Sequence, residues 1–244
     1  MLDTGDILET IKMVDDQNLD VRTITLSLSL LDCASSDGKE AEKKVYDKIM
    51  RRAGKLVETG EKLSGELGIP IVHKRISVTP VSIVGSPSGN YVGIARALDR
   101  AAKEIGVNFI GGYSALVHKA MTDAERDFLA TIPEAISETD MVCSSVNVAS
   151  TRSGINMDAV AMMGRTVKEL AERTADRGAI GCAKFVVFAN AVEDNPFMAG
   201  AFTGLGEGEA TVNVGVSGPG GGAPPPLCLL GSVRSQFKNL LKPW

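Results

Sequence analysis

Strict alternation of apolar and polar side chains marks the first strand that the sequence predicts. In the run TITLSLSLLDC, residues 23–33, every second residue is apolar and most of the residues between are threonine or serine. A period of two places the two sets on opposite faces of a β-strand. The apolar set is Ile24, Leu26, Leu28 and Leu30, and the polar set is Thr23, Thr25, Ser27 and Ser29. The run therefore predicts a strand with one apolar and one polar face.

Strands and helices are expected to alternate along most of the chain. Further strands are predicted near residues 71–79, 108–112, 141–148, 183–191 and 210–216. Helices are predicted over 3–17, as one long helix carrying Val45 to Leu63, over 91–105, from Thr122 onward, and around Val160, Met163, Val167 and Leu170. Thr122 and Glu125 have the spacing of a capping box, and Pro133 is expected to interrupt the helix that this box begins. This order predicts an α/β fold of parallel βαβ units.

Several of these strands repeat the division into two faces. Near residues 71–79, Ile76 and Val78 oppose Arg75 and Ser77. Strands covered by helices on both faces are apolar throughout, so this alternation predicts helices on one face only. The polar face would then border a barrel lumen or a wide cavity. The alternative is a one-sided sheet whose polar face meets solvent.

Composition and charge narrow the classes of partner. The hydrophobic fraction of 44% and the charged fraction of 23% are typical of a globular protein. A net charge of −4 provides no basic surface for nucleic acid, and no apolar run approaches the roughly 18 to 20 residues that span a bilayer. We therefore expect a cytoplasmic protein that binds neither nucleic acid nor membrane. A homo-oligomer is one expected assembly.

Metal and redox chemistry receive little support from the cysteines. Cys33, Cys143, Cys182 and Cys228 form no C-x-x-C pair, so reduced thiols and no metal site are expected. The sequence does not predict which cofactor, if any, the protein binds.

Polar residues are concentrated after the predicted strands, at the carboxyl ends that a parallel sheet brings to one edge. His73 and Arg75 share a face and are suited to bind a carboxylate or phosphate, although an ion pair with a neighbouring acid is the alternative. The expected ligand-binding set is Asp32, Cys33, His73, Arg75, Ser145, Asn147, Asn190, Glu193, Asp194 and Asn195.

Other interpretations stand beside this set. Cys33 is either a thiol paired with the Asp32 carboxylate or a packed, inert cysteine. The acidic run beginning at Glu193 offers oxygen ligands for a hard cation, but Asp and Asn also cap loops. His118 is interpreted as a surface histidine.

Longer segments resemble a known family. They are DVRTITLSLSLLDC, ELGIPIVHKRISVTPVSIVG, ALDRAAKEIGVNFIGGYSALVHK, ETDMVCSSVNVASTRSGINMDAVA and FVVFANAVEDNPFMAGAF. Over about Asp6 to Gly220 they are similar to the PFL-like family, also called domain of unknown function 711 and uncharacterised protein family 0210. The resemblance implies a ten-stranded α/β barrel like that of pyruvate formate-lyase, and family members have no established biochemical function.

The resemblance also implies that the barrel is incomplete in this chain, because family members are nearly twice as long. Residues 1–220 would form part of the barrel, and residues 221–244, rich in glycine and proline at their start, are expected to be an irregular tail. The C-terminal glycine motif and inner-hairpin cysteine of glycyl-radical enzymes have no match here. Thr203 stands where family members commonly have histidine.

Three functional hypotheses follow. The first is an enzyme that acts on a small anionic metabolite at the strand ends. The second is a non-catalytic metabolite sensor or regulatory partner. The third is an inactive, truncated fragment whose unpaired strands seek partners.

Overall fold

The computed structural model describes residues 20–67, 70–196 and 199–217. The helix predicted over 3–17 and the tail predicted over 221–244 lie outside these residues. The strands are β1 (Asp20–Leu28), β2 (His73–Val78), β3 (Phe109–Leu116), β4 (Val142–Ser150), β5 (Gly154–Ile155), β6 (Phe185–Ala189) and β7 (Ala210–Ser217). The helices are η1 (Leu31–Cys33), α2 (Gly38–Ala53), α3 (Leu56–Leu67), α4 (Val81–Val84), α5 (Tyr91–Ile105), α6 (Asp123–Glu138), α7 (Met157–Arg173), η2 (Ala175–Arg177) and α8 (Ile180–Ala183).

One mixed sheet joins all of these strands, so the α/β prediction is confirmed. Its order is β5-β4-β3-β2-β1-β7, and β6 pairs with β4. Strands β1, β2, β3, β4 and β6 are mutually parallel, as predicted. Strands β5 and β7 are the exceptions, since β5 is antiparallel to β4 and β7 to β1; in the part of the chain that the structure describes, no crossover helix lies between β6 and β7. Within the described residues β6 and β7 do not pair with each other, so these strands form an open sheet.

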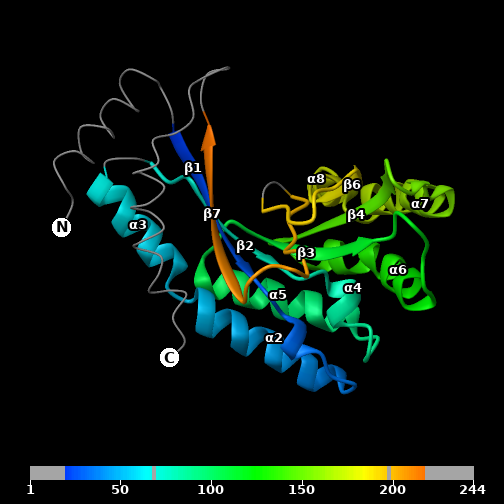
Figure 1. Cartoon of the computed structure of the whole chain (residues 1–244), viewed down its shortest axis with the longest axis horizontal. Helices are drawn as coiled ribbons and strands as arrows, with labels where there is room; N and C mark the ends of the chain where they lie inside the picture. Colours follow the sequence, from blue (N-terminus) through cyan, green and yellow to red (C-terminus); the bar gives the residue numbers. More distant parts are fainter. Residues whose placement is uncertain (1–19, 68–69, 197–198, 218–244) are drawn as a thin grey trace.

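The longer helices form a layer on one face of this sheet. Helices α2, α5, α6 and α7 contact one another in that order. In Figure 1, α2, α5 and α6 lie below the sheet, while the yellow chain that follows β6 lies above it. Ile24, Leu26 and Leu28 are fully buried in the apolar core, as their alternation predicts. Thr25 and Ser27 are fully buried as well, so the face they occupy is not a solvent-facing surface at these positions.

Two helix predictions are wrong. The single helix expected from Val45 to Leu63 is divided into α2 and α3 at Gly54, a residue of low helix propensity. Conversely, α6 continues through Pro133 to Glu138. Pro133 and Ile136 are buried, and their packing offsets the hydrogen bond that proline cannot donate. The capping box of Thr122 and Glu125 is present as predicted.

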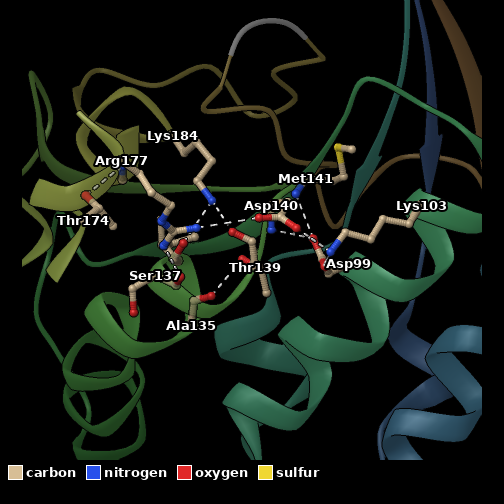
Figure 2. A network of polar contacts seen from close by, with 12 residues as sticks. Asp99, Lys103, Ala135, Ser137, Thr139, Asp140, Met141, Thr174, Arg177 and Lys184 are labelled. Atoms are coloured by element: carbon tan, nitrogen blue, oxygen red, sulfur yellow. Dashed lines mark hydrogen bonds and ion pairs between the residues drawn. The ribbon is translucent and has the colours of Figure 1, made fainter. Parts of the chain in front are cut away.

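A network of charges fixes the helix layer to the amino end of β4 (Figure 2). The Asp99 carboxylate accepts hydrogen bonds from the backbone N–H groups of Asp140 and Met141, at 2.8 and 2.7 Å. Lys103 forms ion pairs with Asp99 at 2.8 Å and with Asp140 at 2.5 Å. Lys184, buried at the start of β6, donates from Nζ to the carbonyl oxygens of Ile136, at 2.9 Å, and Thr139. These contacts place a cation at the carboxyl end of α6, where the helix dipole is negative.

This network predicts a loss of stability in acid. The hydrogen bond from Lys103 holds the pKa of Asp140 below its ordinary value of 3.8. A lowered carboxyl pKa stabilises the fold above the unfolded-state value, and this contribution disappears as the pH falls through the folded-state pKa. We expect Asp140→Asn to lower the urea midpoint at pH 6, and the difference from wild type to shrink as the pH falls below the ordinary carboxyl value of 3.8 and through the lower pKa of the folded state. A difference that persists unchanged into acid would contradict the ion-pair explanation.

Candidate functional site

The polar face of the sheet, defined by Thr25, Ser27, Arg75, Ser77, Ser145 and Asn147, contains a ladder of hydroxyl groups. The Oγ atoms of Ser27 and Ser77 lie 2.7 Å apart, and Ser77 Oγ lies 3.1 Å from Thr203 Oγ1. Asn213 Nδ2 of β7 donates to Ser27 Oγ at 3.0 Å. These bonds satisfy polar groups that would otherwise be costly to bury. The ladder joins β7, β1 and β2 to the chain that follows β6.

Residues 199–204, which we call the crossing segment, lie across this face. The Thr203 N–H donates to the Val78 carbonyl at 3.0 Å, and Ser145 Oγ donates to the Gly200 carbonyl at 3.1 Å. A Cβ atom on Gly111 would lie only 2.5 Å from the Ala201 carbonyl oxygen. Glycine at position 111 therefore permits the close approach, and Ser145, predicted to bind a ligand, anchors the segment.

Arg75 lies on the amino-terminal half of the polar face, in register with Thr25 of β1 and Phe109 of β3. Its guanidinium carbon is 5.8 Å from the centre of the Phe109 ring. The Nε atom is buried, and neither it nor the rest of the guanidinium has a hydrogen bond or ion pair within the described residues. Burial lowers the pKa of Arg75, because the charged form loses hydration. This arrangement presents a poorly compensated cation on the face.

Cys143 is a buried thiol on β4, which is separated from β2 by β3. Burial raises its pKa to about 11, although the charges of Lys184 and Arg75 both favour the thiolate. The thiol is therefore neutral at physiological pH and is a poor nucleophile. The positive charges nearest to this thiol in its electrostatics are therefore those of Lys184 and Arg75.

Asp32 and Cys33 belong to a separate cluster, beyond the carboxyl end of β1. Lys48 of α2, which is only 3% exposed, forms ion pairs with Asp32 and, at 2.5 Å, with Glu209. Burial opposes ionisation of Asp32, but the interaction with Lys48 prevails and lowers its pKa. Burial and the Asp32 charge raise the pKa of Cys33 to about 12. The cluster therefore connects α2 to the chain before β7, and its thiol is not activated.

Asn147 and Asn190 lie near the carboxyl ends of β4 and β6. The Asn147 amide is 3.3 Å from His118 Nδ1, and in the other amide orientation it donates to the Phe188 and Ala149 carbonyls. Asn190 has a left-handed φ of 56° and accepts a hydrogen bond from the Thr151 N–H at 2.6 Å. Both amides thus connect neighbouring chain segments. His118, interpreted as a surface residue, is half-buried beside Asn147.

The acidic run after β6 also makes contacts within the loop. Asp194 Oδ1 accepts a hydrogen bond from the Gly204 N–H at 3.4 Å, and burial raises the pKa of this carboxyl group. Asn195 pairs with Phe202 through the backbone. Glu193 is exposed. Within the described ranges, no three His, Cys, Asp or Glu side chains are placed to hold a metal ion.

The predicted residues therefore form several clusters. His73 and Arg75 begin β2, whereas Asp32 follows the end of β1, so the two groups lie at opposite ends of the polar face. Sequence reasoning missed Phe109, Lys184 and the crossing segment. The glycines at positions 111 and 200 were the sequence signal for the crossing segment, because glycine often marks a close approach of two chain segments. A Cβ on Gly200 would lie 2.4 Å from the Phe188 ring.

A family model described as "Uncharacterised ACR (DUF711)" matches residues 12–221. The chain belongs to the DUF711 family. It is 59% identical to a UPF0210 protein of Listeria monocytogenes serotype 4a (strain HCC23) over 221 residues, which are 90% of this chain and 49% of that relative. A UPF0210 protein of Pelotomaculum thermopropionicum is 60% identical over 222 residues, with the same two shares. This DUF711 chain spans about half the length of the curated relatives it matches.

The family descriptions name no activity. Among the helices that the structure describes, none combines the length and apolar character needed to cross a bilayer.

Proposed function

We propose that this DUF711 protein binds a small anionic ligand, a carboxylate or phosphate, through Arg75 on the amino-terminal half of the polar face. The observation that carries the proposal is the half-buried guanidinium whose Nε atom is buried without a hydrogen-bond partner. Buried polar groups in native proteins nearly always have partners, and an exception is explained by strain, by a catalytic role or by a water or ion that belongs there. An anion would supply the missing acceptor and the missing charge together.

The surroundings of Arg75 support an anion rather than a cation. The Cys143 thiol beside it is neutral, and the local field from Arg75 and Lys184 is positive. Phe109 is 37% exposed, and its ring centre lies 5.8 Å from the guanidinium carbon. An arginine beside an aromatic ring can still donate two parallel hydrogen bonds from its planar fork. A carboxylate or phosphate group matches that fork in geometry and charge.

Binding is better supported than covalent catalysis. Both buried thiols near the proposed clusters, Cys33 and Cys143, have raised pKa values, so neither is an activated nucleophile. The ligand is therefore expected to be recovered unchanged. A metabolite sensor or carrier requires only the anion-binding guanidinium, whereas an enzyme would also require a catalytic nucleophile or base.

Calorimetric titration of the purified chain with inorganic phosphate and with succinate tests the proposal. Arg75→Ala should weaken binding of the responsive anion by about tenfold or more, because it removes charge-assisted hydrogen bonds. Arg75→Lys should retain part of the affinity, because it keeps the charge without the fork. The matched control is Arg152→Ala, on an exposed turn after β4, which should bind like wild type.

Two results would contradict the proposal. One is the absence of any heat or thermal stabilisation with either anion. The other is equal affinity in wild type and in an Arg75→Ala variant with an unchanged circular dichroism spectrum. Mass analysis of the recovered anion distinguishes binding from turnover, since a chemically altered product would indicate an enzyme.

A further inference from the structure

Helix α7 has two apolar stripes, and only one of them is covered. Ala159, Met163, Thr166 and Leu170 are buried against the rest of the helix layer. Met157, Val160, Gly164 and Val167 follow a second stripe at intervals of three and four residues, and all four are exposed. Val160 and Val167 are 37% and 40% exposed, and nothing lies within 4 Å of a Cβ built on Gly164. A surface helix of a globular protein needs only one apolar stripe, so the second indicates a missing neighbour.

The surface beside this stripe is also uncovered. Ile180 of α8 is 44% exposed, and the Cys182 thiol of the same helix contacts the Val167 carbonyl at 3.6 Å. Val187 of β6 is 42% exposed and is in register with Val146, which is buried in the core. We call the set Val160, Gly164, Val167, Ile180 and Val187 the α7–β6 flank. Exposed apolar residues that gather in this way mark interaction surfaces.

The sheet ends without a partner at the same place. Within the described residues β6 pairs only with β4, so its outer edge presents unpaired backbone groups. After β6 the chain does not add another strand and helix here. It crosses the polar face instead and pairs as β7 with β1, on the opposite edge of the sheet. The sheet and the helix layer are therefore both open at one boundary.

We propose that the α7–β6 flank binds the half of a full-length family protein that this chain does not span. The argument for this occupant is length, since the curated relatives contain about as much polypeptide again outside the matched region. A strand added to the edge of β6 would pair its free backbone groups, and an apolar helix packed against Val160 and Val167 would cover the exposed stripe of α7. The partner is thus an α/β polypeptide that presents an edge strand and an apolar helix stripe.

Coexpression with a partner polypeptide tests this inference. The full 244-residue chain carries an affinity tag, and the partner is the unmatched half of the Pelotomaculum thermopropionicum relative. A one-to-one complex is expected by affinity capture and light scattering. Val160→Lys and Val167→Lys should each weaken it by about tenfold or more, because each buries an unpaired ammonium group. Val72→Lys, at a position 52% exposed beside β2, is the matched control and should leave the affinity unchanged.

A second measurement does not depend on substitutions. Amide hydrogen exchange of residues 185–189 should slow by about tenfold or more in the complex, because the free edge of β6 becomes paired. The inference is overturned if no complex forms, or if both lysine variants bind like wild type. It is also overturned if the chain alone is a dimer that the lysine variants convert to monomers, since a second copy would then be the occupant.

Discussion

Phe128→Ala is expected to lower the free energy of unfolding by about 4 kcal/mol, which corresponds to a fall in Tm of roughly 10 °C. Phe128 of α6 is fully buried between two other rings. Its ring centre lies 5.3 Å from that of Tyr91 in an edge-on arrangement and 4.7 Å from that of Tyr113. Truncation removes both aromatic contacts and leaves a cavity between α5, α6 and β3, which the rigid surroundings would fill only in part.

Urea and thermal unfolding monitored by circular dichroism measure this effect. Phe128→Leu is the control, because it keeps an apolar side chain and should lose only about 1 to 2 kcal/mol. The hydroxyl groups of Tyr91 and Tyr113 have separate partners, the Ala124 carbonyl and Thr131, so they should remain satisfied in both variants. A loss below about 1 kcal/mol in the alanine variant would show that this cluster is not a main contributor to stability.

Gly111→Val is expected to displace the crossing segment and to destabilise the protein by about 3 kcal/mol. The first atom of the new side chain would lie 2.5 Å from the Ala201 carbonyl oxygen and 2.9 Å from Ala201 Cβ. Both are nearer than a real Cβ atom can approach, and the obstructing oxygen belongs to the backbone. The segment must therefore move, which breaks the hydrogen bond from Thr203 to Val78.

Hydrogen exchange of the Thr203 amide reports this displacement directly, and its rate should rise by about tenfold or more. Gly65→Ala is the matched glycine control, since nothing lies within 4 Å of a Cβ at that position in α3. It should raise stability by about 0.5 to 1 kcal/mol, the usual gain from alanine in a helix. Unchanged Thr203 exchange in Gly111→Val would mean that the crossing segment is not held against β3.

The crossing segment also limits where a ligand can bind. It lies on the part of the polar face that contains Ser77 and Ser145, and it uses both hydroxyl groups. Arg75 lies two residues before Ser77 on the same strand. It belongs to the part of the polar face that forms no hydrogen bonds with the crossing segment within the described residues. The Gly111→Val and Arg75→Ala variants therefore test different properties of one face, namely its cover and its anion affinity.

Local patterns were sufficient for much of the secondary structure. The alternation in residues 23–28 predicted β1 and the burial of Ile24, Leu26 and Leu28. The spacing of Thr122 and Glu125 predicted the start of α6. These features depend on residues within one or two turns of each other, so the amino-acid sequence carries them directly.

The candidate site was predicted only in part. Alternation placed Arg75 on the polar face with Ser77, and both lie there. The expected convergence with Asp32 did not follow, because β2 begins only at His73 and Arg75 lies in its first half. Ser77 and Ser145 form hydrogen bonds with the crossing segment, and no local sequence pattern predicts where that segment lies.

The sequence by itself determined most of the strands and several of the longer helices, and which side of β1 and β2 is polar. Only the tertiary structure decided what covers that polar side, how α6 continues through Pro133, and why β7 runs antiparallel. The physical reason is the range of the contacts. Ser27 meets Asn213 across 186 positions and Ser77 meets Thr203 across 126, and such pairs form only when the whole chain is packed.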